Sequence, residues 1–330
     1  MYNPEKTTLK EWLQRDLLEY FPQEQLTTNT YVLMLRDLVN RCEPLPNNSK
    51  LLILGGGFSG QHVAALAKEL GTNVICSRRN IHSPGSDCVF NSSSQTLPSQ
   101  RTLKAVTHVL SCIPPDANGK DPVLTSLSNQ LNEMQLQWVG YLSTTGVYGD
   151  SQGKWVKESD LPQPKSPRSK RRLECEKAWE ESGLPIQILR LPGIYGPGRS
   201  AIENIKAGKT KMIDKPGQIF SRVHIDDIAG ATFHLINLAH QGLQPKIINL
   251  ADDVPSTNIE VMVYAASLMG VSLPPIEPFQ KAAKQLSPMA LSFWQENRRV
   301  SNELLCKQLG YSLIHPNYQS GLQDCWLQNK

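Results

Sequence analysis

The sequence lacks the features of a membrane-spanning or secreted protein. No apolar run approaches the roughly 20 residues that a transmembrane helix needs. The first residues contain no apolar core of a signal peptide, and Glu5, Glu11 and Asp16 are acidic residues of the kind that a transit peptide avoids. We therefore expect a cytoplasmic protein with no membrane partner.

Paired cysteines, repeats and a strong charge imbalance are also missing. The seven cysteines are scattered and odd in number, and none forms a Cys-x-x-Cys pair. This pattern predicts reduced thiols, with neither a disulfide framework nor a metal site. The net charge of +4 is mild and does not by itself indicate a nucleic-acid partner. A chain of 330 residues that is 39% hydrophobic fits a globular α/β domain with a smaller lobe.

The most informative segment is a glycine-rich turn that follows an apolar run of strand length. Gly55, Gly57 and Gly60 form a Gly-x-Gly-x-x-Gly pattern, and an amphipathic helical pattern comes after it. In a dinucleotide site the first glycine allows a tight turn and the second lets the backbone approach a pyrophosphate. The third lets the helix pack closely on the strand. Phe58 and Ser59 lie at the helix N-terminus, whose free N–H groups attract phosphate, so all five residues are predicted to bind a dinucleotide.

The residues after the second predicted strand indicate which dinucleotide is bound. A site for NAD usually has an acidic residue about 20 positions after the glycine turn, to bind the ribose hydroxyls. Here the chain has Ser77, Arg78 and Arg79. Two guanidinium groups can hold a 2′-phosphate through paired N–H bonds, whereas a carboxylate would repel it. The pattern favours NADP over NAD, with a solvated arginine pair in a loop as the alternative.

Short apolar runs alternate with helical patterns from residue 51 onward, which predicts a parallel sheet. We predict an α/β fold of the Rossmann type, a doubly wound parallel sheet with an N-terminal helical extension and a smaller C-terminal substrate lobe. The predicted extension spans residues 1–48, the NAD(P)-binding core 49–191 and the lobe 192–330, of which 222–251 returns to the core. The two helices of the extension either pack on the core or form a contact in a homodimer.

Several further segments carry a family resemblance. They are LSTTGVYG after a predicted strand, LRLPGIYGPG, VHIDD before a helix, NLADDVP, and Leu309-Gly-Tyr311 near the end. In order and spacing they resemble the extended short-chain dehydrogenase/reductase family, which includes sugar-nucleotide epimerases and dehydratases. The resemblance covers residues 50 to about 325 and leaves the first 48 outside.

The resemblance implies a catalytic set that this chain has only in part. A Ser or Thr of the family binds the substrate oxygen, and this position falls on Thr144. A Tyr-x-x-x-Lys pair should open a later helix, but matching the helix places Arg168 at the tyrosine position and Arg172 at the lysine position. A register shifted by two residues would place Ser166 and Lys170 there. Neither register supplies a tyrosine.

The missing phenol limits the chemistry. Arginine stays protonated in proteins, so Arg168 cannot exchange a proton with a carbonyl that accepts hydride. It can bind a carboxylate or phosphate, or polarise a carbonyl as a fixed charge. Tyr148 is the remaining candidate acid, with a packing role as the alternative. His224 before Asp226 is expected to be structural. These departures resemble the atypical branch of the family, labelled NAD-dependent epimerase/dehydratase.

Two hypotheses about function follow. The first is an NADP(H)-dependent oxidoreductase or epimerase-like enzyme that acts on a small-molecule substrate, anionic or a sugar nucleotide. The second is a protein that binds NADP(H) and reports its redox state without catalysis. The five cations within residues 165–172 have no interleaved aromatic residues for base stacking, so we do not expect a nucleic-acid partner.

Overall fold

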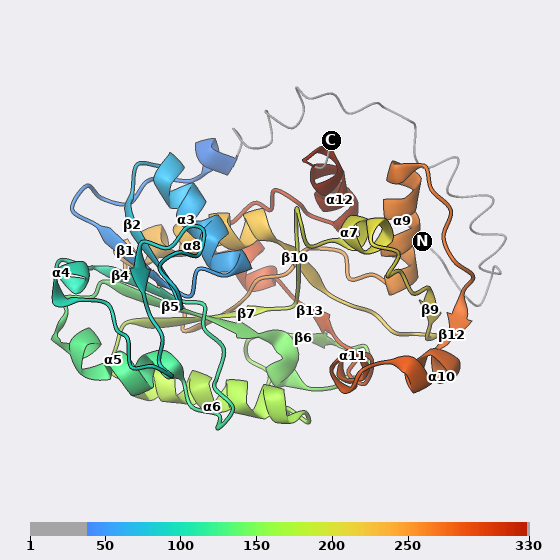
Figure 1. Cartoon of the computed structure of the whole chain (residues 1–330), viewed down its shortest axis with the longest axis horizontal. Helices are drawn as coiled ribbons and strands as arrows, with labels where there is room; N and C mark the ends of the chain where they lie inside the picture. Colours follow the sequence, from blue (N-terminus) through green and yellow to red (C-terminus); the bar gives the residue numbers. More distant parts are fainter. Residues whose placement is uncertain (1–37, 329–330) are drawn as a thin grey trace.

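A seven-stranded parallel sheet forms the centre of the molecule in the computed structural model, which describes residues 38–328. From one edge to the other the strands are β11 (Ile247–Asn249), β7 (Ile186–Leu191), β5 (Trp138–Thr144), β4 (His108–Ser111), β1 (Lys50–Leu54), β2 (Asn73–Arg78) and β3 (Cys88–Val89) (Figure 1). The chain builds outward from β1 to β3, then returns to the other side of β1 at β4. The point where the strand order reverses therefore lies between β1 and β4, where open α/β sheets bind ligands.

The sheet is covered by helices on both faces (Figure 1). One face packs against α3 (Phe58–Glu69) and α8 (Ile225–His240). The other packs against α5 (Pro122–Glu133) and α6 (Pro167–Glu181), with the short α4 (Gln100–Leu103) nearby. The predicted doubly wound α/β fold is confirmed.

The sequence of β1 explains why both faces are filled. Successive side chains of a strand point to opposite faces of the sheet. Leu51 and Ile53 belong to the core cluster with α3 and α8, and Leu52 and Leu54 belong to the cluster with α5 and α6. All four are completely buried. An uninterrupted apolar run is thus what a central parallel strand requires.

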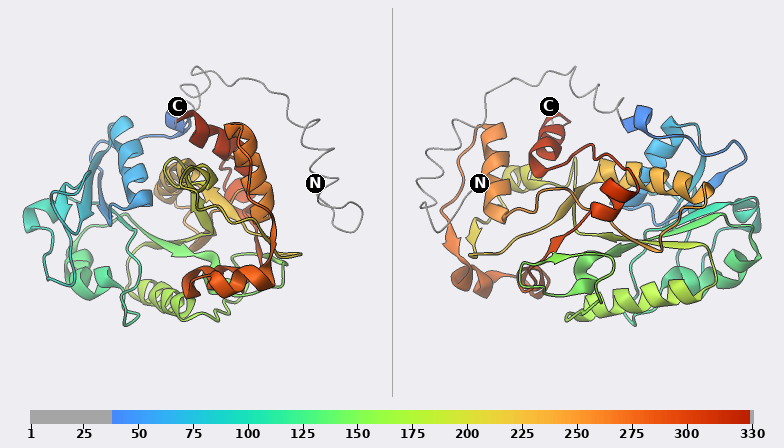
Figure 2. Two further views of the ribbon diagram at one scale, coloured as in Figure 1. Left: turned by 45° about the vertical axis from the view of Figure 1, so that its right-hand side comes forward. Right: turned by 180° about the vertical axis from the view of Figure 1, so that it is seen from behind.

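Beyond β7 the chain builds a smaller group of elements, many of them short. Its helices are α7 (Ala201–Lys206), α9 (Asn258–Met269), α10 (Phe279–Ala282), α11 (Pro288–Trp294) and α12 (Tyr318–Leu327). Its parallel strand pairs are β8 (Gly193–Tyr195) with β10 (Arg222–His224) and β9 (Ile213–Asp214) with β12 (Glu277–Pro278), and its β13 (Arg299–Val300) pairs with β6 (Trp155–Val156), which precedes β7 in the chain. Helical turns at Ala283–Gln285 and Leu304–Gln308 lie within this group, and a third turn, at Thr145–Tyr148, follows β5. Helices α7, α9 and α12 pack together around a separate apolar cluster (Figure 2).

The segment predicted to return to the core contains α8 and β11. Helix α8 packs on α3, and β11 pairs with β7 at the edge of the central sheet. The predicted helices of the N-terminal extension fall mostly on residues 1–37, which lie outside the described residues. Leu38 and Leu45 pack in the cluster that α3 and α8 share. No helix of the described part is long and apolar enough to cross a membrane.

The stability of the fold is expected to depend on pH through two histidines that contact each other. His108 Nε2 lies 2.8 Å from His240 Nε2, and burial and the neighbouring His240 lower the pKa of His108 to about 4. Between about pH 4 and pH 6.5 the folded protein binds fewer protons at His108 than the unfolded chain does. The stability that the neutral His108 contributes is therefore complete above about pH 6.5 and is lost as the pH falls toward 4. From pH 7 to pH 5 we expect a loss on the order of 2 kcal/mol in the free energy of unfolding.

Urea denaturation of the H108Q variant at both pH values tests this dependence. The variant should lose less stability than the natural protein between pH 7 and pH 5. The exposed H82Q serves as the control. Equal losses in the natural protein and in H108Q would contradict the assignment.

Candidate cofactor and substrate site

The glycine-rich turn joins β1 to α3 at the point where the strand order reverses. Gly55 has a φ of +98°, a backbone conformation that favours glycine. A Cβ added at Gly60 would lie 2.4 Å from the carbonyl oxygen of Gly55, so only glycine allows this close packing of helix on strand. A Cβ at Gly57 would meet no atom within 4 Å. The helix N-terminus therefore opens beside a space that a phosphate group can approach.

The end of β2 holds the glycine turn in place. The Gly56 N–H donates to the carbonyl oxygen of Ser77 at 2.7 Å, and the Gly55 N–H donates to the Ser77 hydroxyl at 3.2 Å. Ser77 is completely buried. Its side chain thus positions the turn.

A cavity of about 490 Å³ extends from the glycine turn over the ends of β2 and β4. Gly55, Gly57, Ser77, Arg78 and Arg79 all line it. Phe58, Ser59 and Gly60 open helix α3 beside the cavity and are not among its lining residues. The Nε atom of Arg78 donates to the Pro84 carbonyl at 3.1 Å. Two cations therefore face the cavity at the end of β2, where the sequence predicts a 2′-phosphate.

Sequence reasoning missed the opposite wall of this cavity. It consists of polar residues after β3 and a proline-rich turn after β4: Asn91, Ser92, Ser93, Pro114, Pro115 and Asp116. The Asn-Ser-Ser run directly after a short apolar stretch is the signal that could have indicated it.

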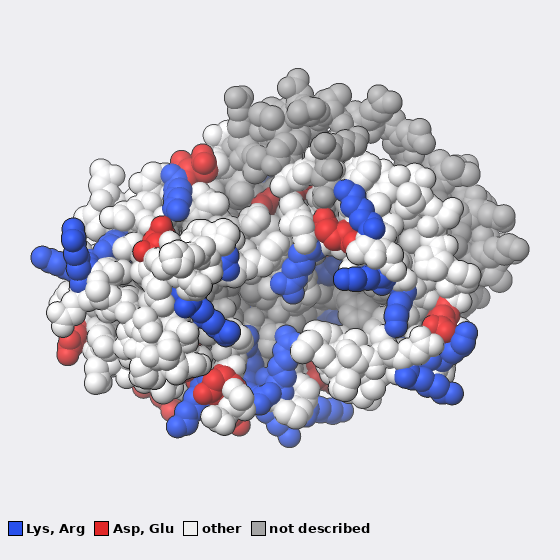
Figure 3. All heavy atoms as spheres, in the orientation of Figure 1, with Lys and Arg blue, Asp and Glu red and all other residues white. Residues whose placement is uncertain are grey.

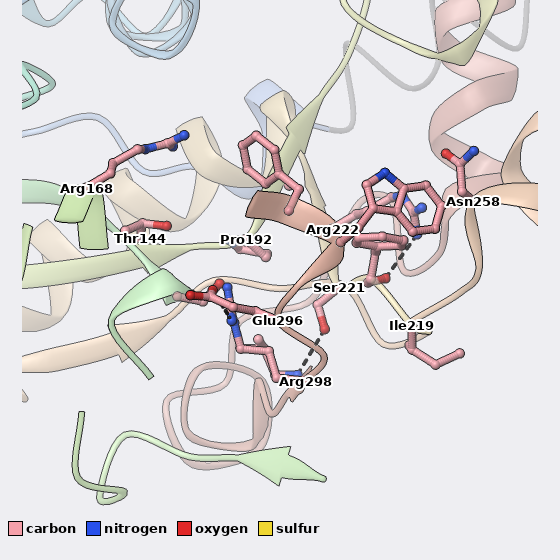
Figure 4. A pocket seen from close by; sticks show the side chains of 15 residues that line it. Thr144, Arg168, Pro192, Ile219, Ser221, Arg222, Asn258, Glu296 and Arg298 are labelled. Carbon is pink, nitrogen blue, oxygen red and sulfur yellow. Dashed lines mark hydrogen bonds and ion pairs between the residues drawn. The ribbon is translucent and has the colours of Figure 1, made fainter. Parts of the chain in front are cut away.

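A second cavity, of about 340 Å³, lies at the carboxyl ends of β5 and β7 (Figure 4). Its residues come from the core and from the smaller lobe: Thr144, Thr145, Arg168, Pro192, Gly193, Ile219, Phe220, Ser221, Arg222, Asn258, Phe293, Trp294, Glu296, Arg298 and Val300. Since β4 and β5 are neighbours, the two cavities follow the same edge of the sheet. Lys and Arg side chains gather around the hollow in the middle of this face (Figure 3).

Arg168 lies at the end of the second cavity that Thr144 also lines (Figure 4). Its guanidinium stacks on the Phe293 ring, 5.3 Å from the ring centre. No ion pair joins Arg168 to a carboxylate of the described residues, whereas Arg298 of the same cavity lies 2.7 Å from Glu296. Burial, followed by the nearby Arg172, lowers the pKa of Arg168. Arg168 is thus a solvent-accessible cation without a carboxylate partner among the described residues, and an anion could bind to it.

Arg172 lies one helical turn further along α6. Its Nη1 donates to the Tyr141 hydroxyl at 2.8 Å and to the Leu142 carbonyl at 3.1 Å, both on β5. Ser166, the alternative from the shifted register, is the N-cap of α6 and accepts the Ser169 N–H. Both registers therefore leave Arg168, and not a hydroxyl, facing the cavity from this helix.

Residues 51–251 match the model of the NAD dependent epimerase/dehydratase family. The chain belongs to this family. It is also 30% identical over 180 residues to protein YeeZ of Escherichia coli K12, and the aligned region covers 54% of this chain and 58% of that relative. The chain therefore aligns with little more than half the length of this curated relative.

Solved structures of similar proteins show the same fold. A conserved protein of unknown function from Silicibacter pomeroyi DSS is 38% identical with a TM-score of 0.74, and the match covers 84% of this chain and 98% of that one. A putative NAD-dependent epimerase/dehydratase from Methylobacillus flagellatus is 24% identical, with a TM-score of 0.64 and coverages of 84% and 97%. The human epimerase family protein SDR39U1, solved with NADPH, is 17% identical, with a TM-score of 0.66 and coverages of 84% and 99%.

Of the two hydroxyl groups predicted to act in catalysis, that of Thr144 lies at the second cavity and that of Tyr148 does not. Thr144 Oγ1 accepts the Gly146 N–H at 3.1 Å, which leaves the hydroxyl proton free to be donated into the cavity. Tyr148 is buried, and its hydroxyl donates to Asn249 at 2.8 Å while Arg190 stacks on its ring. Burial raises the pKa of Tyr148. Tyr148 is not among the residues that line either cavity.

Most of the second cavity was not predicted from the sequence. The lining residues Phe220, Arg222, Trp294 and Arg298 lie about 50 to 125 residues beyond Arg172, the last predicted catalytic position. Arg222 donates to the Phe220 and Ser256 carbonyls and to the Ser256 hydroxyl. The aromatic residues among cations in residues 293–299 were the available signal.

Proposed function

We propose that this family member binds NADP(H) in the larger cavity and acts on a small anionic substrate in the second one. The observation that carries the proposal is the placement of two cations, Arg78 and Arg79, at the end of β2 in the cavity that the glycine turn opens. An adenosine ribose placed beside β2 would bring its 2′-position toward these guanidinium groups. Solved neighbours carry either cofactor, NADPH in human SDR39U1 and NAD in a UDP-glucuronic acid 4-epimerase from Bacillus cereus, so the preference for NADP(H) rests on the two arginines.

The proposed substrate is anionic because Arg168 replaces the family tyrosine. An arginine cannot act as the acid/base of hydride chemistry, but it can orient a carboxylate or phosphate by paired hydrogen bonds. Thr144 would donate its hydroxyl to a substrate oxygen beside it. The bound nicotinamide would supply hydride transfer, and these residues would bind and orient the substrate.

A second candidate function is a non-catalytic sensor of the NADP(H) redox state. It is favoured by one observation: no tyrosine is among the residues that line the second cavity. Stopped-flow absorbance of bound NADPH, mixed with carbonyl compounds that bear a carboxylate or phosphate, separates the two. Oxidation of NADPH by any of them supports the enzyme, and tight binding without oxidation supports the sensor.

The G57A variant tests where the cofactor binds. The added methyl group meets no protein atom, but Gly57 is the N-cap of α3 and alanine caps a helix less well than glycine, so the free energy of unfolding should fall by only about 0.5–1 kcal/mol. If a pyrophosphate lies against this backbone, however, the methyl group occupies its place. We expect the affinity for NADPH, measured by calorimetry, to fall at least about tenfold. Unchanged affinity in a stable variant would place the phosphates elsewhere.

A further inference from the structure

Two pairs of side chains, about 90 residues apart in the sequence, meet beside helix α3. His224 is the N-cap of α8 and Asp226 lies in its first turn, while His315 precedes α12 and Asp324 lies within it. All four are buried, with exposed fractions of 0%, 5%, 0% and 1%. One potential ligand atom from each lies within 4.8 Å of those of the other three. The cluster is separate from the two cavities, since none of the four lines either one.

The polar atoms of the cluster lie in direct contact with one another. His315 Nε2 lies 3.1 Å from Asp226 Oδ2, and His224 Nδ1 lies 3.4 Å from the same oxygen. His224 Nε2 lies 3.5 Å from Asp324 Oδ2. Ligand atoms bound tetrahedrally to zinc at about 2.0–2.1 Å are roughly 3.3 Å apart. His224 contacts Asp226 through Nδ1 and Asp324 through Nε2, and one ion can bind only one of these nitrogens, so a side chain of the cluster must turn for all four groups to bind the same ion.

The buried charge of the cluster requires compensation. Asp226 and Asp324 have no Lys or Arg at ion-pair distance within the part of the chain that the structure describes, and their ion-pair partners are histidines. Asp324 also accepts from the Gln328 amide. Burial lowers the pKa of His315, but the hydrogen bond to Asp226 and the nearby carboxylates raise it overall, so a protonated His315 can balance only one of the two buried carboxylates. A divalent cation would balance both.

An unsatisfied nitrogen supplies an independent observation. Nδ1 of His315 is buried and has no hydrogen-bond partner among the described residues. A buried polar atom without a partner costs free energy, and an ion bound to Nδ1 would satisfy it while Nε2 keeps its contact with Asp226 Oδ2. His62, from α3, places its Nε2 3.4 Å from Asp226 Oδ1 with its side chain 34% exposed, so the cluster has a contact with the surface.

We propose that His224, Asp226, His315 and Asp324 bind a divalent transition metal of the zinc class. Two imidazoles and two carboxylates suit zinc better than magnesium or calcium, which prefer oxygen ligands alone. Four ligands from the protein make a closed, structural site. The ion would link α12 and the segment before it to the start of α8. Helix α8 packs on α3, the helix that follows the glycine-rich turn. The Cys325 thiol lies 3.9 Å from His224 Nε2, beside the site.

Cobalt titration of the full chain tests the proposal. Protein treated with EDTA is titrated with Co²⁺, and the visible ligand-field bands are recorded, followed by displacement with Zn²⁺. We expect about one equivalent of Co²⁺ with the intense bands of a four-coordinate site. We also expect a higher melting temperature with Zn²⁺ than with EDTA.

Two ligand variants and one control complete the experiment. H315Q and D324N should each weaken Co²⁺ binding at least about tenfold, whereas the exposed H82Q should bind like the natural protein. Co²⁺ that binds to the natural protein without ligand-field bands, or no binding and no thermal shift, would overturn the proposal. A Co²⁺ affinity in H315Q and D324N equal to that of the natural protein would also overturn the proposal. If the variants do not fold, the titration of the natural protein decides.

Discussion

Replacing Arg78 by aspartate is expected to weaken NADPH binding about 10- to 100-fold, as loss of a charge-assisted hydrogen bond to phosphate would. The new carboxylate repels a 2′-phosphate but can accept hydrogen bonds from the ribose hydroxyls of NADH. The affinity for NADH should therefore stay the same or rise, and the preference between the two cofactors should reverse or disappear.

Calorimetric titration with both nucleotides measures this preference. R101D is the matched control, because it makes the same change of charge on α4, at a residue outside the cavity lining. Since Arg78 also donates to the Pro84 carbonyl, the unfolding free energy of R78D is measured alongside. An unchanged ratio of the two affinities in a stable R78D protein would show that Arg78 does not bind the 2′-phosphate.

The E176Q variant is expected to lose about 3–5 kcal/mol of stability, the cost of leaving one member of a buried ion pair without its partner. Glu176 of α6 lies 2.7 Å from the Arg190 Nη2 of β7, and both side chains are only 2% exposed. The Arg190 Nε also donates to both carboxylate oxygens, and the Ser143 hydroxyl donates to one of them. These contacts join α6, which carries Arg168, to two central strands.

A double replacement sharpens the stability prediction. Replacing both charges, as E176L/R190M, should cost less than E176Q, because no unpaired charge stays buried. E180Q, on the exposed side of α6, should change the unfolding free energy by no more than about 0.5 kcal/mol. A small effect of E176Q in urea denaturation would contradict the importance of this pair.

The fold could be predicted from local patterns because those patterns carry a direct physical requirement. Few other folds can bury the apolar run at residues 51–54 and also pair the backbone groups of the glycine turn and the amphipathic helix that follow it. The family could also be predicted from the sequence, and the family model matches residues 51–251. The cofactor cavity follows from this geometry, with Arg78 and Arg79 at its wall.

The rest depends on contacts between distant segments. Trp294 and Arg298 reach the second cavity from short irregular elements, whose positions no periodicity reveals. The meeting of His224 with His315 and Asp324 needs α12 to fold back onto α8, and their spacing of about 90 to 100 residues matches no metal motif. For this reason the sequence predicted no metal.

Calorimetric titration of the natural protein with NADPH and with NADH is the most direct test of the central claim, that a nicotinamide dinucleotide binds over the turn between β1 and α3. We expect one site per chain and a tighter complex with NADPH than with NADH, and an affinity for NADPH at least about tenfold weaker in G57A. No heat of binding with either nucleotide, from protein shown to be folded, would contradict the claim.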